Sequence, residues 1–548
     1  MLNRRQTLGS LLTGTVALAA PTAPAAAHRT GKADSASPGQ TTSDSGNEWA
    51  WMKWPRGIEG QRKADLGNGT FLNPIVSGDH PDPSILKEGR DYFLTFSSFD
   101  AYPGLVIWHS RDLVNWQPLN AALRTPIGSV WAPDLSKYKG RYYLYIPART
   151  PGRNSIYVIT AEDVRGPWSE PVDLNLPGHI DPNHVVGEDG TRYLALSGGD
   201  LVELAEDGLA TAGAPKHIYD PWRYPESWVV ESFSPEGPKI LRHGDYLYML
   251  TAVGGTAGPP TGHMVTVARA RSVHGPWENA PNNPVVRTTS ATQKWWSRGH
   301  ASAVEGPDGS WWLVYHGYEN GFWTLGRQTL LAPMEWTKDG WIKTKGGDLS
   351  RPIKKPKGGQ AVPHGMALSD DFSTDRFGSL WSFYDPGPTE MERARFASDG
   401  LHVRGKGSQP FDCSPISFRA GDPSYEVETE IEISGGAQAG LLLFYNRRLY
   451  CGLGFDAGKF VMHRQGLERA QPKPADVGNR LFLHIANDRH IVTIRYSPDG
   501  KSWSKFGVQM EVSGYHHNTA YDFLSLRPAI YVAGPGEARF SAVNYRAL

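Results

Sequence analysis

The sequence predicts an all-β protein in which a five-bladed β-propeller is followed by a β-sandwich. Five times along the first 320 residues, a turn glycine is followed by a short run of aromatic and aliphatic residues. The glycines are Gly89, Gly140, Gly190, Gly244 and Gly309, and they lie 51, 50, 54 and 65 residues apart. A repeat of about 40–50 residues that is rich in aromatic and turn residues is typical of propeller blades. No long segment with helical periodicity interrupts the repeats.

The N-terminus predicts a signal peptide over residues 1–27. Arg4 and Arg5 precede an apolar run over residues 8–20, and Ala25–Ala27 offers a small-residue cleavage site. The paired arginines favour the twin-arginine route, with an ordinary secretory signal as the alternative. We therefore expect an exported protein, periplasmic or extracellular. No other apolar run approaches the roughly 18 residues of a membrane-spanning helix.

Changes in composition predict the remaining boundaries. Residues 28–69 form a disordered leader and an N-terminal extension, and the repeats occupy residues 70–350. Residues 351–366 are a basic linker rich in proline and glycine, whose charge we interpret as solvated chain. The sandwich follows over residues 367–548. Its clearest strand is 425–433, where apolar and acidic residues alternate as on a half-buried antiparallel strand.

Net charge and composition limit the classes of binding partner that the sequence supports. The 548 residues contain 56 Lys and Arg and 56 Asp and Glu, so nothing indicates a nucleic-acid or membrane partner. The 19 Trp and 23 Tyr can pack blades together, and the same rings can stack on the apolar faces of sugars. Cys413 and Cys451 can form a disulfide or remain buried thiols, and the sequence leaves both open.

Each repeat carries an ionisable residue six to nine positions before its turn glycine. In chain order these residues are Asp82, Asp134, Asp181, Glu236 and His300. Equivalent positions of successive blades converge on the central axis of a propeller. The repeat therefore predicts that side chains far apart in the sequence meet at one end of one channel.

Carboxyl groups brought together in this way suit acid–base chemistry. Cleavage of a glycosidic bond needs one protonated carboxyl to donate to the leaving oxygen and one carboxylate on the opposite face. A third carboxylate nearby can raise the pKa of the acid. Asp82, Asp181 and Glu236 each lie beside proline or glycine. If only one such carboxylate were present, we would interpret it as a turn-forming or capping residue. Three at matched positions favour a catalytic site.

Six ordered motifs resemble glycoside hydrolase family 43 across residues 70–350. They are Asn73-Pro74 through Pro81-Asp82-Pro83-Ser84, Trp131-Ala132-Pro133, Ile180-Asp181-Pro182, Glu236-Gly237-Pro238, Gly299-His300 and Leu325-Gly326-Arg327. Trp311-Trp312 and Glu335-Trp336 extend the match. The following region opens with Asp370-Asp371-Phe372 and resembles the concanavalin-like, jelly-roll sandwich of many β-xylosidases of this family.

The resemblance implies an inverting exo-glycosidase that acts on oligo- or polysaccharides of plant cell-wall pentoses, a β-xylosidase first of all. By motif position, Asp82 is the general base, Glu236 is the general acid, and Asp181 modulates the pKa of the acid. Arg327 binds the sugar, its planar fork suiting such contacts. Trp131 forms a wall of the sugar subsite, and a Trp in the core of a blade is the alternative.

The resemblance also implies a cation on the propeller axis. His300 lies close to an ion that is coordinated mostly by water, commonly calcium in this family. Because calcium prefers oxygen ligands, a single histidine implies an optional structural ion. We therefore expect no required cofactor.

The sequence departs from the pattern in two places, and both leave the sugar open. After Glu236, residues 251–256 lack the acidic residue that xylosidases of the family often carry before Gly-Gly-Thr. Asp134 adds a fourth carboxylate, for which a strand-end residue bonded to the backbone is the alternative. The competing functions are an α-L-arabinofuranosidase or dual enzyme, a non-catalytic carbohydrate-binding protein, and a protein-interaction platform. Linkage and oligomeric state stay open.

Overall fold

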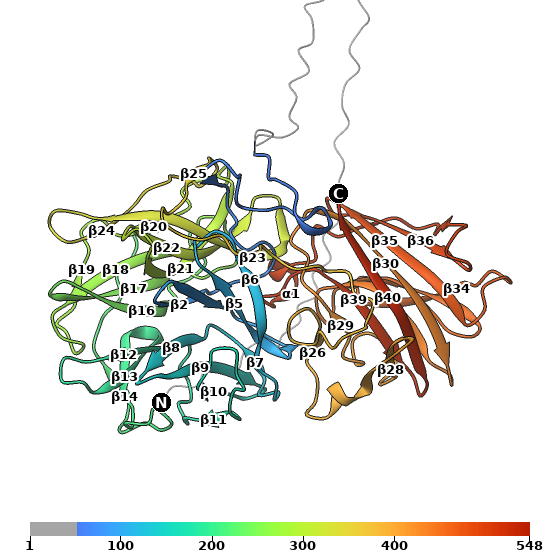
Figure 1. The fold of residues 1–548 in the computed structure, drawn as a ribbon, viewed down its shortest axis with the longest axis horizontal. Coiled ribbons are helices and arrows are strands. Elements are labelled where there is room, and N and C mark those ends of the chain that lie inside the picture. The colour runs from blue at the N-terminus through green and yellow to red at the C-terminus, as the bar shows by residue number, and fades with distance from the viewer. Residues whose placement is uncertain (1–51) are drawn as a thin grey trace, which may run out of the picture. The chain divides into compact units, whose positions relative to one another are not determined.

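The computed structural model describes residues 52–548 (Figure 1). The predicted signal peptide and the leader up to residue 51 lie outside the described residues. Within the described part the regular structure is strands, apart from three short 3-10 helices and α1 (His517–Ala520). In the same part of the chain, no helix has the length and apolar character needed to cross a membrane.

Residues 84–344 form five antiparallel sheets, the blades of a five-bladed propeller (Figure 1). Blade 1 contains β2 (Ser84–Glu88), β3 (Asp91–Thr95), β5 (Gly104–Ser110) and β6 (Gln117–Leu123). Blade 2 contains β7 (Ser129–Val130), β8 (Asp134–Tyr138), β9 (Arg141–Thr150), β10 (Arg153–Ala161) and β11 (Val172–Asp173). Blade 3 contains β12 (Asn183–Val186), β13 (Arg192–Leu196), β14 (Asp200–Glu203) and β15 (Lys216–His217). Blade 4 contains β16 (Glu236–His243), β17 (Tyr246–Val253), β18 (Met264–Ala270), β19 (Glu278–Asn279) and β20 (Val286–Arg287). Blade 5 contains β21 (Trp295–Glu305), β22 (Trp311–Glu319), β23 (Phe322–Trp336) and β24 (Ile342–Thr344).

The repeated phrase of the sequence is the hairpin that opens each blade, preceded in blade 2 by the two-residue strand β7. Gly89 joins β2 to β3, and Gly140 joins β8 to β9. Both have positive φ, +59° and +84°, a conformation that glycine adopts without strain. The aromatic and aliphatic residues after each glycine then form the second, largely buried strand. The predicted five-bladed propeller is confirmed.

Apolar clusters between neighbouring blades close the ring. Phe93 of blade 1 and Leu144 of blade 2 belong to one cluster of buried side chains. Leu94 of blade 1 and Val314 of blade 5 belong to another, so the last blade packs against the first. This closure directs the first strands of all five blades toward one axis.

Residues 367–548 form the predicted β-sandwich of two large sheets. The first sheet contains β34 (Leu467–Pro472), β33 (Lys459–Arg464), β32 (Tyr450–Phe455), β31 (Gln438–Phe444), β39 (Arg527–Ala533), β29 (Ile416–Ser417) and β26 (Ser382–Tyr384). The second contains β27 (Ala394–Ala397), β28 (Gly400–Arg404), β40 (Glu537–Ala547), β30 (Ser424–Ser434), β35 (Arg480–Asp488), β36 (Ile491–Ser497), β37 (Ser504–Lys505) and β38 (Met510–Glu511). In β30 the predicted alternation is confirmed, with Tyr425, Val427 and Ile431 buried.

Strand pairing ties the two domains together. β4 (Ala101–Tyr102) lies between β3 and β5 in the chain, yet it pairs with β26 and extends the first sheet of the sandwich. β1 (Thr70–Phe71) of the N-terminal extension pairs with β25 (Ile353–Lys354) of the linker. The linker is therefore more than solvated chain: the Lys355 Nζ atom lies 2.5 Å from Asp65 Oδ2 and 3.1 Å from Asp112 Oδ2.

The two cysteines do not pair. Cys413 and Cys451 are free and buried. Burial raises the pKa of each thiol to about 12, which keeps both protonated and unreactive near neutral pH. Of the two alternatives that the sequence left open, the structure shows buried thiols.

Candidate active site

One pocket of about 330 Å³ gathers residues from all five blades and from the sandwich. It is lined by Asp82, Phe99, Trp131, Ala132, Ile180, Asp181, Glu236, Thr256, His300, Arg327 and Phe523. The six residues that the sequence singles out for catalysis, sugar binding or a metal are all among them.

The blade repeat explains why these side chains meet. Asp82 and Asp181 come two residues before β2 and β12, Glu236 is the first residue of β16, and His300 lies within β21. Asp82, Asp181 and His300 have φ values of +56°, +55° and +56°. Few residues other than glycine adopt this left-handed conformation, and such strain is concentrated at functional sites. The chain therefore makes the same unusual turn at three equivalent positions of the ring.

Asp82 is held as a carboxylate. Its Oδ1 atom accepts a hydrogen bond of 2.7 Å from Arg327 Nη1, and its Oδ2 atom accepts one of 2.5 Å from Ser97 Oγ. Its backbone N–H donates to His316 Nδ1 at 3.1 Å. Burial has the largest single effect and would raise the pKa of this carboxyl, but the Arg327 guanidinium acts together with His300 and His316 to hold the pKa well below its usual range.

Glu236 and Asp181 are shifted in the opposite direction. Burial, followed by the negative charges of Asp181 and Asp82, raises the pKa of Glu236 well above its usual value. Burial and the charge of Asp82 also raise the pKa of Asp181, whose Oδ2 atom accepts a hydrogen bond of 3.0 Å from the N–H of Gly237. That contact places the Asp181 carboxyl next to the residue that follows Glu236. The pocket thus holds one ionised carboxylate and a coupled pair that retains a proton.

Such opposed carboxyl groups can act as base and acid in one reaction. A glycosidic bond between them would receive a proton from one side while water is activated on the other. Separation of pKa values between two carboxyls of one site is the usual way in which proteins assign these roles.

The sandwich supplies a wall of the pocket. Phe523 follows α1, and its ring stacks on Phe99 with the centroids 6.3 Å apart. Trp131 meets Phe523 edge to face at 6.4 Å, and the Arg327 guanidinium lies 5.1 Å from the centre of the same ring. His517 stacks on Phe523 at 4.0 Å, which fixes the ring from the side of the sandwich. The site is therefore built by both domains.

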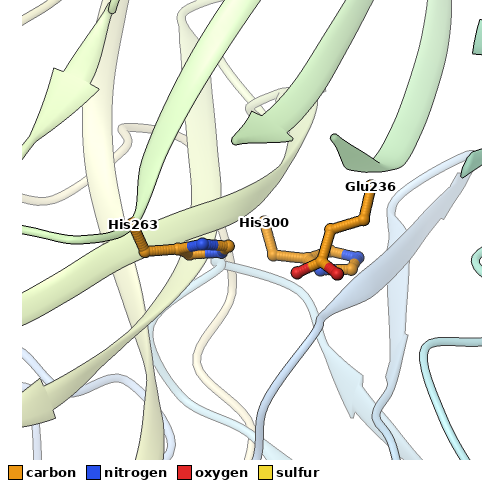
Figure 2. Close-up of side chains that lie close together, drawn as sticks. All are labelled: Glu236, His263 and His300. Atoms are coloured by element: carbon orange, nitrogen blue, oxygen red, sulfur yellow. The ribbon is translucent and has the colours of Figure 1, made fainter. Parts of the chain in front are cut away.

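Two histidines, His263 and His300, lie beside the carboxyl group of Glu236 (Figure 2). Ligand atoms of Glu236, His263 and His300 all lie within 4.8 Å of one another. His263 stacks on His316 at 5.2 Å, and the Nδ1 atom of His300 is 3.4 Å from Asp82 Oδ1. Among residues 52–548, His300 Nε2 and both ring nitrogens of His263 have no hydrogen-bond partner. Burial lowers the pKa of His300 to about 3, so the ring is neutral and can act as a ligand.

The fourth carboxylate, Asp134, does not line this pocket. Its Oδ1 atom accepts hydrogen bonds from Lys239 Nζ at 2.9 Å and from Asn183 Nδ2 at 2.8 Å. Its Oδ2 atom accepts from the N–H of His184 at 3.0 Å. Asp134 therefore cross-links blades 2, 3 and 4.

Four residues at the site were not predicted from the sequence: Phe99, His263, His316 and Phe523. Thr256 ends the segment 251–256, which the sequence marks as a departure from the family pattern. His316 lies in the Trp-rich segment that carried the family resemblance, and this segment could have drawn attention to it. Phe523 lies in an irregular loop of the other domain, where no periodicity or motif marks it.

Comparison with known proteins places these features in a family. The fold and the paired carboxyls define a glycoside hydrolase, and residues 71–342 match the family model described as "Glycosyl hydrolases family 43". Residues 369–546 match the one described as "Beta xylosidase C-terminal Concanavalin A-like domain". The two models together match most of the chain, and the chain belongs to glycoside hydrolase family 43. The resemblance noted from the motifs is confirmed.

Individual relatives differ in activity. The chain is 34% identical over 339 residues to "Non-reducing end alpha-L-arabinofuranosidase BoGH43B" of Bacteroides ovatus, covering 58% of this chain and 62% of that protein. It is 33% identical over 314 residues to "Xylan 1,3-beta-xylosidase" of a Vibrio species, covering 49% and 56%. These alignments span less than two thirds of either relative. The crystal structure of the GH43 protein BlXynB from Bacillus licheniformis superposes with a TM-score of 0.77 at 27% identity, covering 87% of this chain and all of that one.

Proposed function

We propose that this family 43 hydrolase is an inverting exo-β-xylosidase that removes single sugars from the non-reducing ends of plant pentose glycans. The observation that carries the proposal is the opposed electrostatics of Asp82 and Glu236 around one small pocket. The pocket holds about 330 Å³ of space between its lining atoms, part of it open to solvent, and this small size suits one sugar ring.

The residues divide the work as follows. Asp82 accepts a proton from the attacking water, while Glu236 protonates the leaving oxygen, so that the water adds to the opposite face and the anomeric configuration inverts. Asp181 keeps the pKa of Glu236 raised through its negative charge. Arg327 orients Asp82 and donates to a sugar hydroxyl, and Trp131 and Phe523 pack against the ring.

An α-L-arabinofuranosidase, alone or combined with xylosidase activity, is the second candidate. It is favoured by the arabinofuranosidase from Bacteroides ovatus, at 34% identity. The purified protein should be assayed on p-nitrophenyl β-D-xylopyranoside and p-nitrophenyl α-L-arabinofuranoside in parallel, with the Glu236→Gln variant as a control for contaminating activity. A kcat/KM at least tenfold higher on the xyloside supports the first proposal. A higher value on the arabinofuranoside overturns it in favour of an α-L-arabinofuranosidase. If neither substrate is turned over, the result favours a non-catalytic carbohydrate-binding protein.

The axial cation is a separate proposal. Calcium takes six to eight oxygen ligands, whereas the cluster offers imidazole nitrogens and the carboxyl of Glu236, which the reaction needs as an acid. The donor set therefore suits calcium only through water ligands, with His300 among the groups around it. Metal analysis of the purified protein and thermal unfolding with and without chelator test this proposal. Loss of one bound calcium with a lower Tm is the expected result.

Export is also proposed, from the twin-arginine pattern at Arg4 and Arg5 and the cleavage site before His28. N-terminal sequencing of protein recovered outside the cytoplasm should begin at or near His28.

A further inference from the structure

A second cavity lies at a junction of several segments and shares no lining residue with the catalytic pocket. It holds about 740 Å³ of space between its lining atoms, part of it open to solvent. Lys63 comes from the N-terminal extension, His80 and Trp108 from the propeller, His364 from the linker and Arg419 from the sandwich. His80 is two residues before Asp82, so the segment that carries the proposed base also lines this cavity.

Two cations of this cavity, Arg419 and Lys63, form no ion pair with an acidic group in the part of the chain that the structure describes. Among the described residues 52–548, no carboxylate forms an ion pair with Arg419 or with Lys63, and neither side chain donates a hydrogen bond. The Arg419 Nε atom is itself buried and without a hydrogen-bond acceptor in that part of the chain. Burial, aided by the charge of Arg527, lowers the pKa of Arg419 to about 10, which still leaves the guanidinium charged near neutral pH. The charge of Asp79 acts on Arg419 in the opposite direction, but Asp79 is paired with Arg527 instead. A partly buried cation without a direct ion pair is costly.

The carboxylates around the cavity are engaged elsewhere. Asp79 forms an ion pair of 3.0 Å with Arg527. Glu59 accepts hydrogen bonds from the N–H groups of Leu368 and Ser369 at 2.7 and 3.0 Å. Asp422 accepts one from the N–H of Arg62 at 3.2 Å. Among the described residues, none of these groups therefore forms a direct ion pair with Arg419 or Lys63, although the charge of Asp79 acts on Arg419.

The remaining polar groups of the cavity add no negative charge. Burial and then the charge of Arg419 lower the pKa of His80 to about 3, and burial and then Lys63 lower that of His364 to about 4. Both rings are therefore neutral near pH 7. Trp108 adds an indole N–H, which is a donor only.

We propose that this cavity is a binding site for a small oxyanion, a carboxylate or a phosphate group. The anion would be held by the Arg419 guanidinium, whose planar fork matches two oxygens, and by the Lys63 ammonium, with the indole N–H of Trp108 as a further donor. The bound anion would contact the N-terminal extension through Lys63 and the sandwich through Arg419, next to the segment that leads to Asp82. Because the segments come together only in the folded protein, the anion stabilises the folded state. This inference does not depend on the sugar that the enzyme cleaves.

The test is calorimetric titration with inorganic phosphate and with acetate, at constant ionic strength set by sodium chloride. Thermal unfolding is measured in the same buffers. The variants are Arg419→Met and Lys63→Met, and the matched control is Arg469→Met, an exposed arginine on β34. Binding of phosphate but not acetate assigns the site to phosphate groups, and the reverse assigns it to carboxylates.

The wild-type protein and Arg469→Met should bind one anion per chain and show a saturable rise in Tm of roughly 1–3 °C. Arg419→Met should lose both effects, and Lys63→Met should bind at least threefold more weakly. In anion-free buffer Arg419→Met should unfold at no lower temperature than the wild type, because it removes a partly buried charge that has no ion pair among the described residues. No heat of binding, or an equal and unsaturable rise in Tm in all four proteins, overturns the proposal. If Arg419→Met does not fold, unchanged binding by Lys63→Met overturns it.

Discussion

Asp181→Asn removes a negative charge beside Glu236 and leaves the shape of the pocket nearly unchanged. In the wild type, Asp181 is the charged group with the largest effect on the pKa of Glu236, second only to burial. Its Oδ2 atom lies 3.0 Å from the N–H of Gly237, so its carboxyl is close to the acid. Removal of the charge favours the ionised form of Glu236 and therefore lowers the pKa of this acid.

The size of the effect follows from Coulomb's law. Two unit charges about 6 Å apart, at an effective dielectric constant of about 20, interact by about 3 kcal/mol, which corresponds to about 2 pH units. Because side chains and water relax, we expect the basic limb of the pH profile of kcat/KM to move down by roughly 1–2 pH units. Asn can still accept a hydrogen bond from Gly237, so the fold should persist.

The assay is the pH dependence of kcat/KM on an aryl glycoside between pH 4 and pH 9. Glu231→Gln serves as a matched control, because Glu231 acts on Glu236 more weakly than Asp181 or Asp82 does. It should shift the basic limb less than Asp181→Asn. An unchanged basic limb in Asp181→Asn, or a limb displaced to higher pH, would refute this account of Asp181.

Three further predictions concern the acid and the sandwich. Glu236→Gln should lower turnover of a substrate with a poor leaving group by about two to four orders of magnitude, and turnover of an activated aryl glycoside by less, so an equal loss on both would count against Glu236 as the acid. Phe523→Ala should lower kcat/KM by about 10- to 100-fold through lost packing, whereas Tyr521→Ala, at an 82% exposed neighbour, should change it less than threefold. Removal of residues 365–548 should leave an inactive or poorly folded propeller, because it deletes Phe523 and the strand partner of β4. A stable, fully active fragment would contradict this.

The sequence was sufficient to predict which residues of the site lie at equivalent positions of the blade repeat. Asp82, Asp181 and Glu236 occupy equivalent positions of three blades, and a ring brings equivalent positions together. Asp134 occupies the same position but is paired with Lys239, more than 100 residues away. The position within a repeat predicts where a residue lies, and its partners determine what it does.

Contacts between domains could not be predicted from the sequence. Phe523 reaches the pocket from an irregular loop, and Arg419 reaches the second cavity from the sandwich. Neither residue belongs to a repeat or a motif, because its place depends on how two independently patterned domains pack. The pairing of β4 with the sandwich could not be predicted either, because a strand of two residues is too short to show a periodic pattern.

The most direct test of the central claim is proton NMR of the sugar released in the first minutes of hydrolysis. The account assigns base and acid to Asp82 and Glu236, which come from blades 1 and 4 and line the same pocket. Such a pair delivers water to the face opposite the leaving group. A β-xyloside should therefore first release α-xylose, before mutarotation mixes the anomers. Initial release of β-xylose would show a retaining reaction and would contradict the roles assigned to both residues.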